Sequence, residues 1–476
     1  MLPKFGTSGL RGLARDLTTG LSVGYTRAFA RHLLAGDLIN QGASVAIARD
    51  LRASSPEIAS LCAQGLRDCG LKPVDCGQIP TPCLAYFAAL HGHAAIMVTG
   101  SHIPEDRNGI KFYRPDGEIS KIDEAAIVDL YEQERNKSSG ISIDPAVSAI
   151  NQSEQAENVF LERLHSFLPS QALKGLRVGV HEHSSVGRDI LVRCLREYGA
   201  QVTSLARSDK FIAVDTEAVD AGTQRLLRSW TTDHKLDAIV STDGDADRPM
   251  VADENGDIIA GDLIGLLTAE FLNATHIITP VTSNSGISTT QSRHVYRTKV
   301  GSPYVIAEMA LHLSNQARVV GFEANGGVLV GSCCKINGTD LSPLPTRDCF
   351  LPILAVLGSA MQKGGKITKL FEGRNLPVTH ADRLQDYPID VAQDFIDQLT
   401  NNAEFVSNNF GNAGNIADVD VTDGLRMAFE SGDIVHFRMS GNAPELRCYA
   451  EGKSRLAAQN NVQKALDVAR RHLLDA

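Results

Sequence analysis

The segment LDAIVSTDGDADR, residues 236–248, begins as a short apolar run and changes abruptly into a loop with three aspartates. The run from Leu236 to Thr242 is rich in β-branched residues, which predicts a buried strand. Open α/β sheets place their chemistry just beyond the carboxyl ends of such strands. The segment therefore predicts an α/β unit with a functional loop at the edge of its sheet.

Three carboxylates alternate in this loop, at Asp243, Asp245 and Asp247, and Arg248 follows directly. Carboxylates this close repel one another and are tolerated when a cation lies among them. An EF-hand calcium loop is excluded, because Arg248 stands where that loop needs glycine and the flanks are strand-like. Oxygen ligands alone suit Mg²⁺, which completes its shell with water and phosphate oxygens. The loop predicts a magnesium site near a phosphate, with a solvated acidic turn as the alternative.

The size and composition of the chain limit its class. At 476 residues it exceeds one hydrophobic core, which predicts about three or four domains. A net charge of −10 argues against a nucleic-acid-binding surface, although local basic clusters still allow small anionic substrates. No apolar run has the length of a membrane span or the form of a signal sequence. Nine cysteines without a C-x-x-C pair are typical of reduced thiols, so we expect a cytoplasmic protein.

Strand-like and helix-like segments alternate through the first three-quarters of the chain, which predicts α/β layers. Ser44–Asp50 and His93–Ser101 are expected to be strands, and a helix is expected from about Ser54 to Cys69. The polar segment Lys137–Gln155 predicts a linker. After residue 365 the regular alternation of strand-like and helix-like segments ends, which predicts a separate α+β domain. We expect domains at 1–150, 156–258, 259–364 and 366–476.

A serine loop follows the strand that ends near Ser101. Thr99-Gly100-Ser101-His102 opens into a polar stretch that leads to Lys111. Beside Mg²⁺, a serine hydroxyl could accept and return a phosphoryl group, because the metal and a lysine neutralise the developing charge. Taken alone, the tetrapeptide is more typical of an ordinary turn, so this interpretation depends on the aspartate loop. No G-x-S-x-G elbow or Walker-type P-loop supports a hydrolase or P-loop kinase.

Three further loops contain groups suited to phosphate or sugar. RMSGNAPELR at 438–447 sets two arginines around a turn whose N–H groups could form an anion nest, with a charged surface hairpin as the alternative. GTSGLRG at 6–12 is a weaker candidate of the same kind, a glycine-rich turn with one cationic side chain. EANGG at 323–327 offers a carboxylate and an amide to sugar hydroxyls, or is only a hairpin turn. HEH at 181–183 lacks a third metal ligand, and we assign it a structural or supporting role.

Together and in this order, the motifs resemble the α-D-phosphohexomutase superfamily of the bacterial phosphomannomutase/phosphoglucomutase type, over the whole chain. The resemblance implies three α/β domains with mixed sheets and a smaller C-terminal α+β lid around one cleft. It implies a magnesium-dependent intramolecular phosphotransferase that interconverts hexose 6-phosphate and hexose 1-phosphate, with mannose or glucose or both as the sugar. A phosphoserine would form a hexose 1,6-bisphosphate, which reorients and returns its other phosphate.

The resemblance also implies a role for each loop. One Mg²⁺ per chain would be held by the phosphoserine and the three aspartates, that is by Ser101, Asp243, Asp245 and Asp247. The residues lining the transfer site would be His102, Lys111, Arg248 and Arg11. The sugar would meet Lys299, Glu323 and Asn325. The distant phosphate would be bound by Arg438, Ser440, Gly441, Asn442 and Arg447. Hexose 1,6-bisphosphate would be the activator. The protein would be a monomer or weak dimer that binds a phosphosugar and binds neither nucleic acid nor a membrane.

Several residues depart from the family pattern. Gly327 stands where many members carry a histidine suspected of acid/base duty, so Lys111, His102 or water would handle the proton. Ile103, Arg107 and Asn325 replace the family's usual Asn, Tyr and Ser, which leaves the choice of sugar open. Phosphoglucosamine mutase is one alternative, although the sugar loop lacks its Glu-Gln-Ser-Gly-His pattern. A phosphosugar phosphatase and a non-catalytic sugar-phosphate-binding protein are the others.

Overall fold

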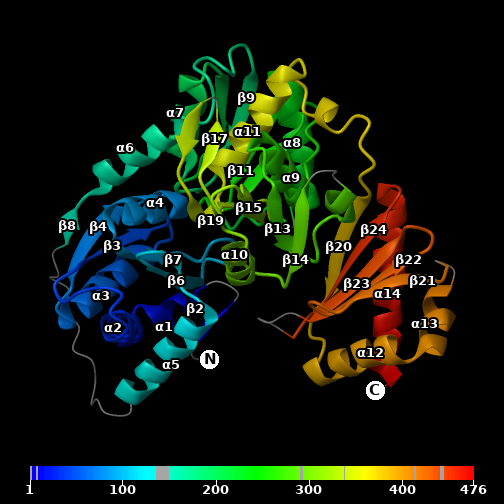
Figure 1. Ribbon diagram of the computed structural model, residues 1–476, viewed down its shortest axis with the longest axis horizontal. Coiled ribbons are helices and arrows are strands. Elements are labelled where there is room, and N and C mark those ends of the chain that lie inside the picture. Colours follow the sequence, from blue (N-terminus) through cyan, green and yellow to red (C-terminus); the bar gives the residue numbers. More distant parts are fainter. Residues whose placement is uncertain are drawn as a thin grey trace.

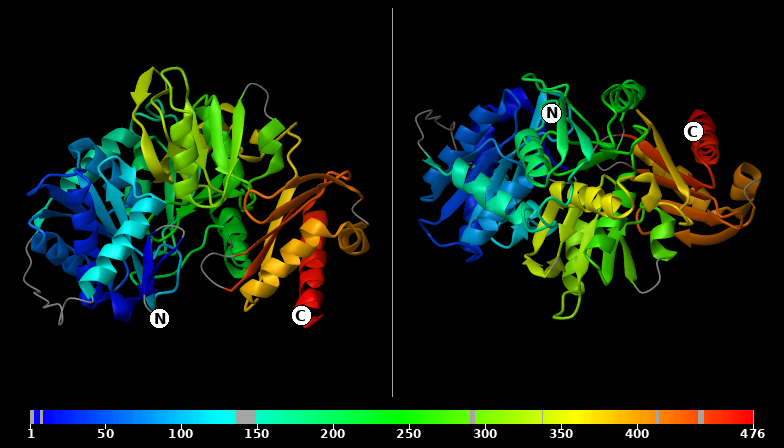
Figure 2. Two further views of the ribbon diagram at one scale, coloured as in Figure 1. Left: turned by 60° about the horizontal axis from the view of Figure 1, so that its bottom comes forward. Right: turned by 90° about the horizontal axis from the view of Figure 1, so that it is seen from above.

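The computed structural model describes residues 3–6, 9–135, 149–217, 219–289, 293–336, 338–411, 414–439 and 444–475. Figure 1 shows four units, with the first (blue to cyan) and the last (orange to red) at opposite ends and two units between them. Both views in Figure 2 keep this order. Within the described ranges, no helix is long and apolar enough to cross a membrane.

The first unit is built on a mixed sheet of order β1-β2-β6-β5-β3-β4-β8, with β7 paired to β6. Its middle strand β5 (Ala94–Val98) is buried at every position, because helices cover both faces of the sheet and leave no polar side to the strand. Ser44–Asp50 and His93–Ser101 are confirmed as strand regions. The other strands are β1 (Lys4–Phe5), β2 (Leu10–Leu13), β3 (Ser44–Arg49), β4 (Lys72–Gly77), β6 (Arg107–Arg114), β7 (Gly117–Glu118) and β8 (Ile150–Asn151), and the helices are α1 (Ala14–Leu17), α2 (Gly20–Ala35), α3 (Ser55–Asp68), α4 (Thr81–His91) and α5 (Lys121–Arg135).

The predicted linker at 137–155 lies partly outside the described residues, and its described end is not a linker. β8 pairs in parallel with β4, and α6 (Ser153–Leu164) begins directly afterwards. The polar composition concealed an amphipathic helix, because its apolar residues recur at helical spacing and turn one face inward. Ala156, Phe160 and Leu164 are buried on that face. The expectation was therefore wrong for residues 150–155.

The second and third units continue the α/β pattern. Their sheets have the orders β10-β9-β11-β12 and β14-β13-β15-β16-β19, each with parallel strands and an antiparallel edge. The apolar run of the aspartate segment is β11 (Ala238–Thr242), as the sequence predicts. The other strands are β9 (Arg177–His181), β10 (Gln201–Leu205), β12 (Pro249–Ala252), β13 (His276–Pro280), β14 (His294–Thr298), β15 (Val319–Phe322), β16 (Val328–Val330), the hairpin β17 (Cys334–Ile336) and β18 (Thr339–Leu341), and β19 (Leu344–Asp348). The helices are α7 (Arg188–Glu197), α8 (Ala221–His234), α9 (Gly261–Phe271), α10 (Ser302–Leu311) and α11 (Phe350–Gln362), with 3₁₀ turns at Ser285–Thr289 and Thr368–Leu370.

The fourth unit is an antiparallel sheet of order β20-β24-β23-β22-β21, which confirms the predicted α+β domain. Its hydrophobic cluster runs from Leu384 to Ala469 and is separate from the cluster that joins the first three units between Ala46 and Leu370. The fourth unit therefore has its own core. Its strands are β20 (Val378–Leu384), β21 (Ile416–Asp420), β22 (Leu425–Phe429), β23 (Ile434–Met439) and β24 (Leu446–Gly452), and its helices are α12 (Ile389–Asn401), α13 (Ala403–Phe410) and α14 (Arg455–Asp475).

His436 on β23 makes the stability of this unit depend on pH. Its side chain is buried, its Nε2 lies 2.6 Å from the Asp423 carbonyl, and burial lowers its pKa to about 4. The unfolded chain binds the proton from about pH 6.5 downward, so acid favours unfolding between about pH 6.5 and 4, by up to about 3 kcal/mol. We expect His436→Gln to remove this loss in urea unfolding measured at pH 7 and pH 4.5. A variant that keeps the wild-type difference between the two pH values would contradict this.

Candidate active site

Ser101 lies at the carboxyl end of β5 in a strained turn. Its φ is 53°, in the left-handed region that residues other than glycine seldom adopt, and its side chain is 1% exposed. The Ser101 N–H donates to Thr99 Oγ1 at 2.8 Å, and this hydroxyl donates to Asp50 Oδ2 at 2.7 Å. Since β3 and β5 are neighbouring parallel strands, Asp50 after β3 meets this turn at the same edge of the sheet. The turn holds the Ser101 hydroxyl in one place.

Arg52 supports the backbone of the serine loop through hydrogen bonds. The sequence did not indicate this role. Its guanidinium donates to four backbone carbonyls at 2.6–3.0 Å, those of Ser101, Ile103, Pro104 and Arg107. Its Nε also donates to Asp50 Oδ2 at 3.2 Å. Gly100 is required here, because a Cβ would come within 2.4 Å of Arg52 Cζ. The available signal was an Asp-x-Arg pattern immediately after a strand of the same sheet.

We expect Arg52→Met to destabilise the protein by about 3–5 kcal/mol, because the Asp50 carboxylate would remain buried without its ion-pair partner. Urea unfolding measures the loss, and the double variant Asp50→Asn/Arg52→Met should recover part of it. The control is Arg27→Met, since Arg27 pairs with Asp68 at the surface and should cost about 1 kcal/mol or less. Equal losses for Arg52→Met and Arg27→Met would refute the supporting role.

The three aspartates follow β11 and face the serine. Each is at most 1% exposed, and one oxygen from each lies within 4.8 Å of the others. Ser101 Oγ donates to Asp243 Oδ2, which joins the two loops across the first and second units. Within the described residues, Asp245 Oδ1 and Asp247 Oδ1 are buried without a hydrogen-bond partner. Two buried carboxylate oxygens without a hydrogen bond, beside a serine hydroxyl, fit a hard cation such as Mg²⁺.

Two cations donate to the Oδ2 oxygens of Asp245 and Asp247. Lys111 Nζ donates to Asp245 Oδ2 and to Asp247 Oδ2, both at 2.6 Å. Burial would lower the pKa of Lys111, but these two carboxylates outweigh it and raise that pKa. Arg347 on β19, also missed by sequence reasoning, donates to Asp247 Oδ2 at 2.7 Å and to Glu323 Oε2 at 2.7 Å. Lys111 and Arg347 therefore donate to the Oδ2 oxygens and leave Asp245 Oδ1 and Asp247 Oδ1 without a hydrogen bond.

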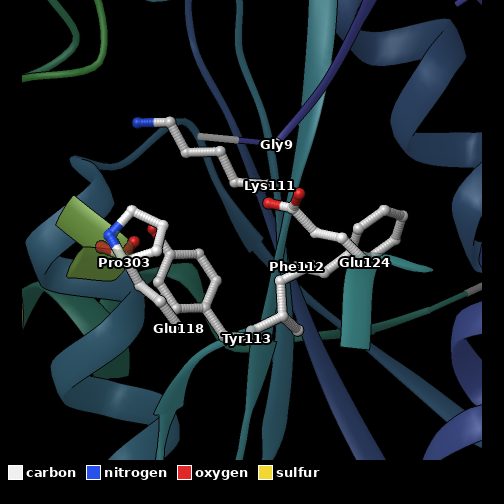
Figure 3. A pocket seen from close by; sticks show the side chains of 8 residues that line it. Gly9, Lys111, Phe112, Tyr113, Glu118, Glu124 and Pro303 are labelled. Atoms are coloured by element: carbon white, nitrogen blue, oxygen red, sulfur yellow. The ribbon is translucent and has the colours of Figure 1, made fainter. Parts of the chain in front are cut away.

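Figure 3 shows the strand that carries Lys111, with Lys111 and Tyr113 on one side of β6 and Phe112 on the other. The alternation is that of a strand, so the position of Lys111 follows from the strand itself. A cavity of about 10 Å³ borders Lys111, Tyr113, Glu118 and Pro303. It has room for about one water molecule and not for a sugar phosphate.

The remaining residues predicted for the transfer site lie around Ser101. His102 Nδ1 is 3.3 Å from Ser101 Oγ, and Arg11 on β2 donates to the Gly100 carbonyl. Burial, followed by Arg248 and Arg11, lowers the pKa of His102 to about 2. Arg248 Nε lies 3.7 Å from Asp247 Oδ1. The structure thus brings together the five side chains that the resemblance assigned to phosphoryl transfer, and His102 is neutral there.

The predicted sugar loop, residues 323–327, forms the turn between β15 and β16. Glu323 and Asn325 are buried, and the Gly327 N–H donates to Asn325 Oδ1 at 3.0 Å. Position 327 must be glycine, because a Cβ there would stand 2.7 Å from Arg347 Cδ. Arg347 therefore fills the space that a side chain at 327 would need. This explains the missing histidine in physical terms.

The predicted phosphate clamp lies on the fourth unit. Arg438 on β23 is the register partner of Arg447 on β24, so both side chains lie on the same face of the sheet. Ser440, Gly441 and Asn442 lie outside the described residues. Asp423 Oδ2 accepts from Arg438 Nε at 2.8 Å and from the Val300 N–H at 2.9 Å, beside the exposed Lys299. Asp423 thereby links the clamp to the loop of the third unit.

Comparison with known proteins gives consistent matches. Models described as phosphoglucomutase/phosphomannomutase alpha/beta/alpha domains I, II and III match residues 2–138, 158–256 and 255–375. A phosphomannomutase from Sinorhizobium fredii is 47% identical over 469 residues, covering 98% of this chain and 99% of the relative. A phosphomannomutase from Salmonella muenchen is 43% identical over 464 residues, covering 97% and 94%. A phosphoglucosamine mutase from Alkaliphilus metalliredigens is 28% identical over 382 residues, covering 77% and 80%.

Solved structures share the fold. A phosphoglucomutase/phosphomannomutase family protein from Burkholderia thailandensis superposes with a TM-score of 0.74 at 22% identity, covering 98% of this chain and 97% of the other. Parafusin, a phosphoglucomutase from Paramecium in an open form, gives a TM-score of 0.70 at 14% identity, covering 99% and 95%. At these identities, the structures support the architecture of four units and nothing finer.

Proposed function

Because the chain belongs to the phosphoglucomutase/phosphomannomutase family of the α-D-phosphohexomutase superfamily, we propose that it interconverts mannose 6-phosphate and mannose 1-phosphate, with glucose phosphates as second substrates. The reaction class is that of a phosphotransferase mutase acting on hexose phosphates. Two relatives at 47% and 43% identity that carry the name phosphomannomutase support mannose as the sugar. The phosphoglucosamine mutases are more distant, at 28% identity for the example above, and disfavour that alternative.

One observation carries the mechanism: the Ser101 hydroxyl donates to Asp243 in a loop where Asp245 and Asp247 each keep one oxygen without a hydrogen bond. Mg²⁺, when bound, would supply charge neutralisation at the transferred phosphate. The sugar hydroxyl attacks the phosphorus of phospho-Ser101, the bond from phosphorus to Ser101 Oγ breaks, and the proton of the sugar hydroxyl passes to Ser101 Oγ. Lys111 and Arg248 place positive charge around the phosphoryl group during transfer. In the second half, Ser101 Oγ attacks the other phosphate of the hexose 1,6-bisphosphate, the bond from that phosphorus to the sugar oxygen breaks, and the sugar oxygen takes up the proton that Ser101 loses, which regenerates phospho-Ser101 and leaves the isomeric hexose monophosphate.

The second phosphate requires a distant site that accepts either end of the sugar. Arg438 and Arg447, with Ser440, Gly441 and Asn442, would bind this phosphate, while Lys299, Glu323 and Asn325 would meet the sugar. The separate core of the fourth unit supports a clamp that moves relative to the transfer site. Such motion would let the bisphosphate reorient without leaving the protein.

The remaining features of the proposal concern cofactors and setting. One Mg²⁺ per chain and hexose 1,6-bisphosphate as activator are supported by the aspartate cluster and by the family chemistry. We also propose that the protein is cytoplasmic, that it is a monomer or weak dimer, and that its domains follow the expected ranges 1–150, 156–258, 259–364 and 366–476, with β8 and the start of α6 in place of the first linker. Size-exclusion chromatography with light scattering would test the oligomeric state.

The deciding experiment compares mannose, glucose and glucosamine 1-phosphates in a coupled assay with Mg²⁺ and hexose 1,6-bisphosphate. We expect the highest kcat/KM with mannose 1-phosphate, a lower value with glucose 1-phosphate, and by far the lowest with glucosamine 1-phosphate. A preference for glucosamine would identify a phosphoglucosamine mutase instead. Release of inorganic phosphate in place of isomer would indicate a phosphatase, and no turnover at all would indicate a binding protein.

A further inference from the structure

The segment that connects β10 to α8, residues 206–217, runs from the support of the serine loop to the predicted sugar loop. It contains no helix or strand, so side-chain contacts fix its course. The Phe211 ring lies over the Arg52 guanidinium, with its centroid 3.9 Å from Cζ. Further along, Thr216 Oγ1 donates to the Asn325 carbonyl at 3.5 Å. The second unit thereby reaches the sugar loop of the third unit.

Glu217 ends this segment with a carboxylate that has no partner. Its backbone N–H donates to Asp215 Oδ1 at 3.0 Å, which fixes the turn before it. Its side chain is exposed, and among the described residues the carboxylate has no hydrogen-bond partner and no cationic nitrogen within 4.0 Å. Both of its oxygens can therefore accept hydrogen bonds from a ligand.

Charged groups from three units act on Glu217. Desolvation by the surrounding protein has the largest effect and raises its pKa, the two carboxylates among these groups act in the same direction, and the two arginines oppose them. The groups that interact with it are Arg248, Asp215, Glu323, Arg447 and, on β24, Tyr449. An exposed carboxylate that so many groups influence faces a space that the second, third and fourth units share.

Two of these groups belong to the two predicted phosphate sites. Arg248 lines the transfer site, Arg447 belongs to the phosphate clamp, and Glu217 interacts with both. A bound hexose bisphosphate would place one phosphate at each arginine and its sugar ring between them. The carboxylate of Glu217 repels phosphate and accepts hydrogen bonds from hydroxyls, so it favours the sugar ring as its neighbour.

We propose that Glu217 is a sugar-binding residue, whose carboxylate accepts hydrogen bonds from ring hydroxyls of the hexose while its phosphates occupy the transfer site and the clamp. This inference rests on the proposed phosphohexomutase function. It adds the second unit to the sugar contacts, which the resemblance assigned to the third unit through Lys299, Glu323 and Asn325. The two oxygens of Glu217 can accept from different hydroxyls, so one residue serves the ring in both orientations of the bisphosphate.

Deoxy sugars test this contact. Mannose 1-phosphate and its 2-, 3- and 4-deoxy analogues are compared as substrates of the full chain with Mg²⁺ and hexose 1,6-bisphosphate, and phosphorus NMR follows the isomerisation. The wild-type protein should prefer mannose 1-phosphate over at least one analogue by ~10-fold or more in kcat/KM, because the missing hydroxyl leaves a charged acceptor without its donor. Glu217→Ala should lower kcat/KM for mannose 1-phosphate by at least ~10-fold and reduce that preference to ~3-fold or less.

Asp209→Ala is the matched control. Asp209 lies on the same segment, its side chain is 98% exposed, and its carboxylate is 3.8 Å from Arg188. This variant should keep every wild-type value. Glu217→Gln keeps the size of the side chain and covers a disturbance of the segment by alanine. It removes the charge of the acceptor and should lower kcat/KM for mannose 1-phosphate by at least ~3-fold.

The outcomes separate this inference from the proposed function. A wild-type protein that isomerises none of the four sugars would overturn the proposed function, and this inference with it. An active wild type with unchanged kcat/KM in both Glu217 variants would overturn this inference alone. A lower kcat/KM with unchanged preferences among the four sugars would also overturn it, because Glu217 would then only adjust the charge around Arg248 and Arg447.

Discussion

Ser101→Ala is expected to lower kcat for hexose phosphate isomerisation by at least ~1000-fold, because no other group described at the transfer site replaces the hydroxyl that receives the phosphoryl group. The Ser101 Oγ is held by the left-handed turn and by Asp243, so its loss leaves a gap at the one point where both half-reactions meet. The coupled assay measures kcat. Intact mass spectrometry should show one phosphate on the wild-type protein and none on the variant.

Ser22→Ala provides the control for removing a buried serine hydroxyl. Ser22 on α2 is fully buried and its Oγ donates to the Leu17 carbonyl at 2.6 Å. Loss of the Ser22 hydroxyl should lower the free energy of unfolding by about 1 kcal/mol and should leave kcat and the phosphate on Ser101 unchanged. Undiminished turnover by Ser101→Ala, or phosphate retained on that variant, would remove serine from the mechanism.

Asp245→Asn is expected to raise the Mg²⁺ concentration for half-maximal activity by at least ~30-fold and to lower kcat by ~100-fold, effects of the size seen for single charged groups in a transfer site. Asp245 supplies an unpaired oxygen at Oδ1 and accepts from Lys111 and Thr81 at Oδ2. An amide has one oxygen instead of two and carries no charge, so it cannot serve both duties. A magnesium titration of the coupled assay measures both quantities.

Asp253→Asn is the matched control for this change. Asp253 is also a buried aspartate after a strand, but its Oδ1 accepts only from the backbone N–H groups of Asn255 and Asp257. It should leave the magnesium dependence at the wild-type value. Activity of Asp245→Asn that needs no metal, or an unchanged magnesium requirement, would contradict the assignment of the aspartate loop.

Elements dominated by local pattern could be predicted from the sequence. The β-branched run of β11 and the apolar run of β5 are short and apolar, which predicts buried strands. The positions of the loops at the ends of these strands follow from the same prediction. Helix α6 was missed because its exposed residues dominate its composition and hide the buried face.

The supporting side chains of the site could not be predicted in the same way. Arg52 acts on carbonyls 49–55 residues further along the chain, and Arg347 acts on an aspartate 100 residues before it. A lone arginine in a sequence looks the same whether it meets solvent or a buried carboxylate, because only the tertiary fold decides its partner. The three aspartates, in contrast, have an unusual local context that indicates chemistry without knowledge of their neighbours, and the interpretation of the serine depends on them.

The contact between Gly327 and Arg347 restricts how this protein can evolve. Any lineage that acquires a side chain at position 327 must first shorten residue 347, and that change removes the shared donor of Asp247 and Glu323. We therefore expect the two substitutions to be coupled, so that their combined effect on stability differs from the sum of the single effects. Aligned descendants should show the two positions covarying, with glycine retained wherever the arginine is inherited.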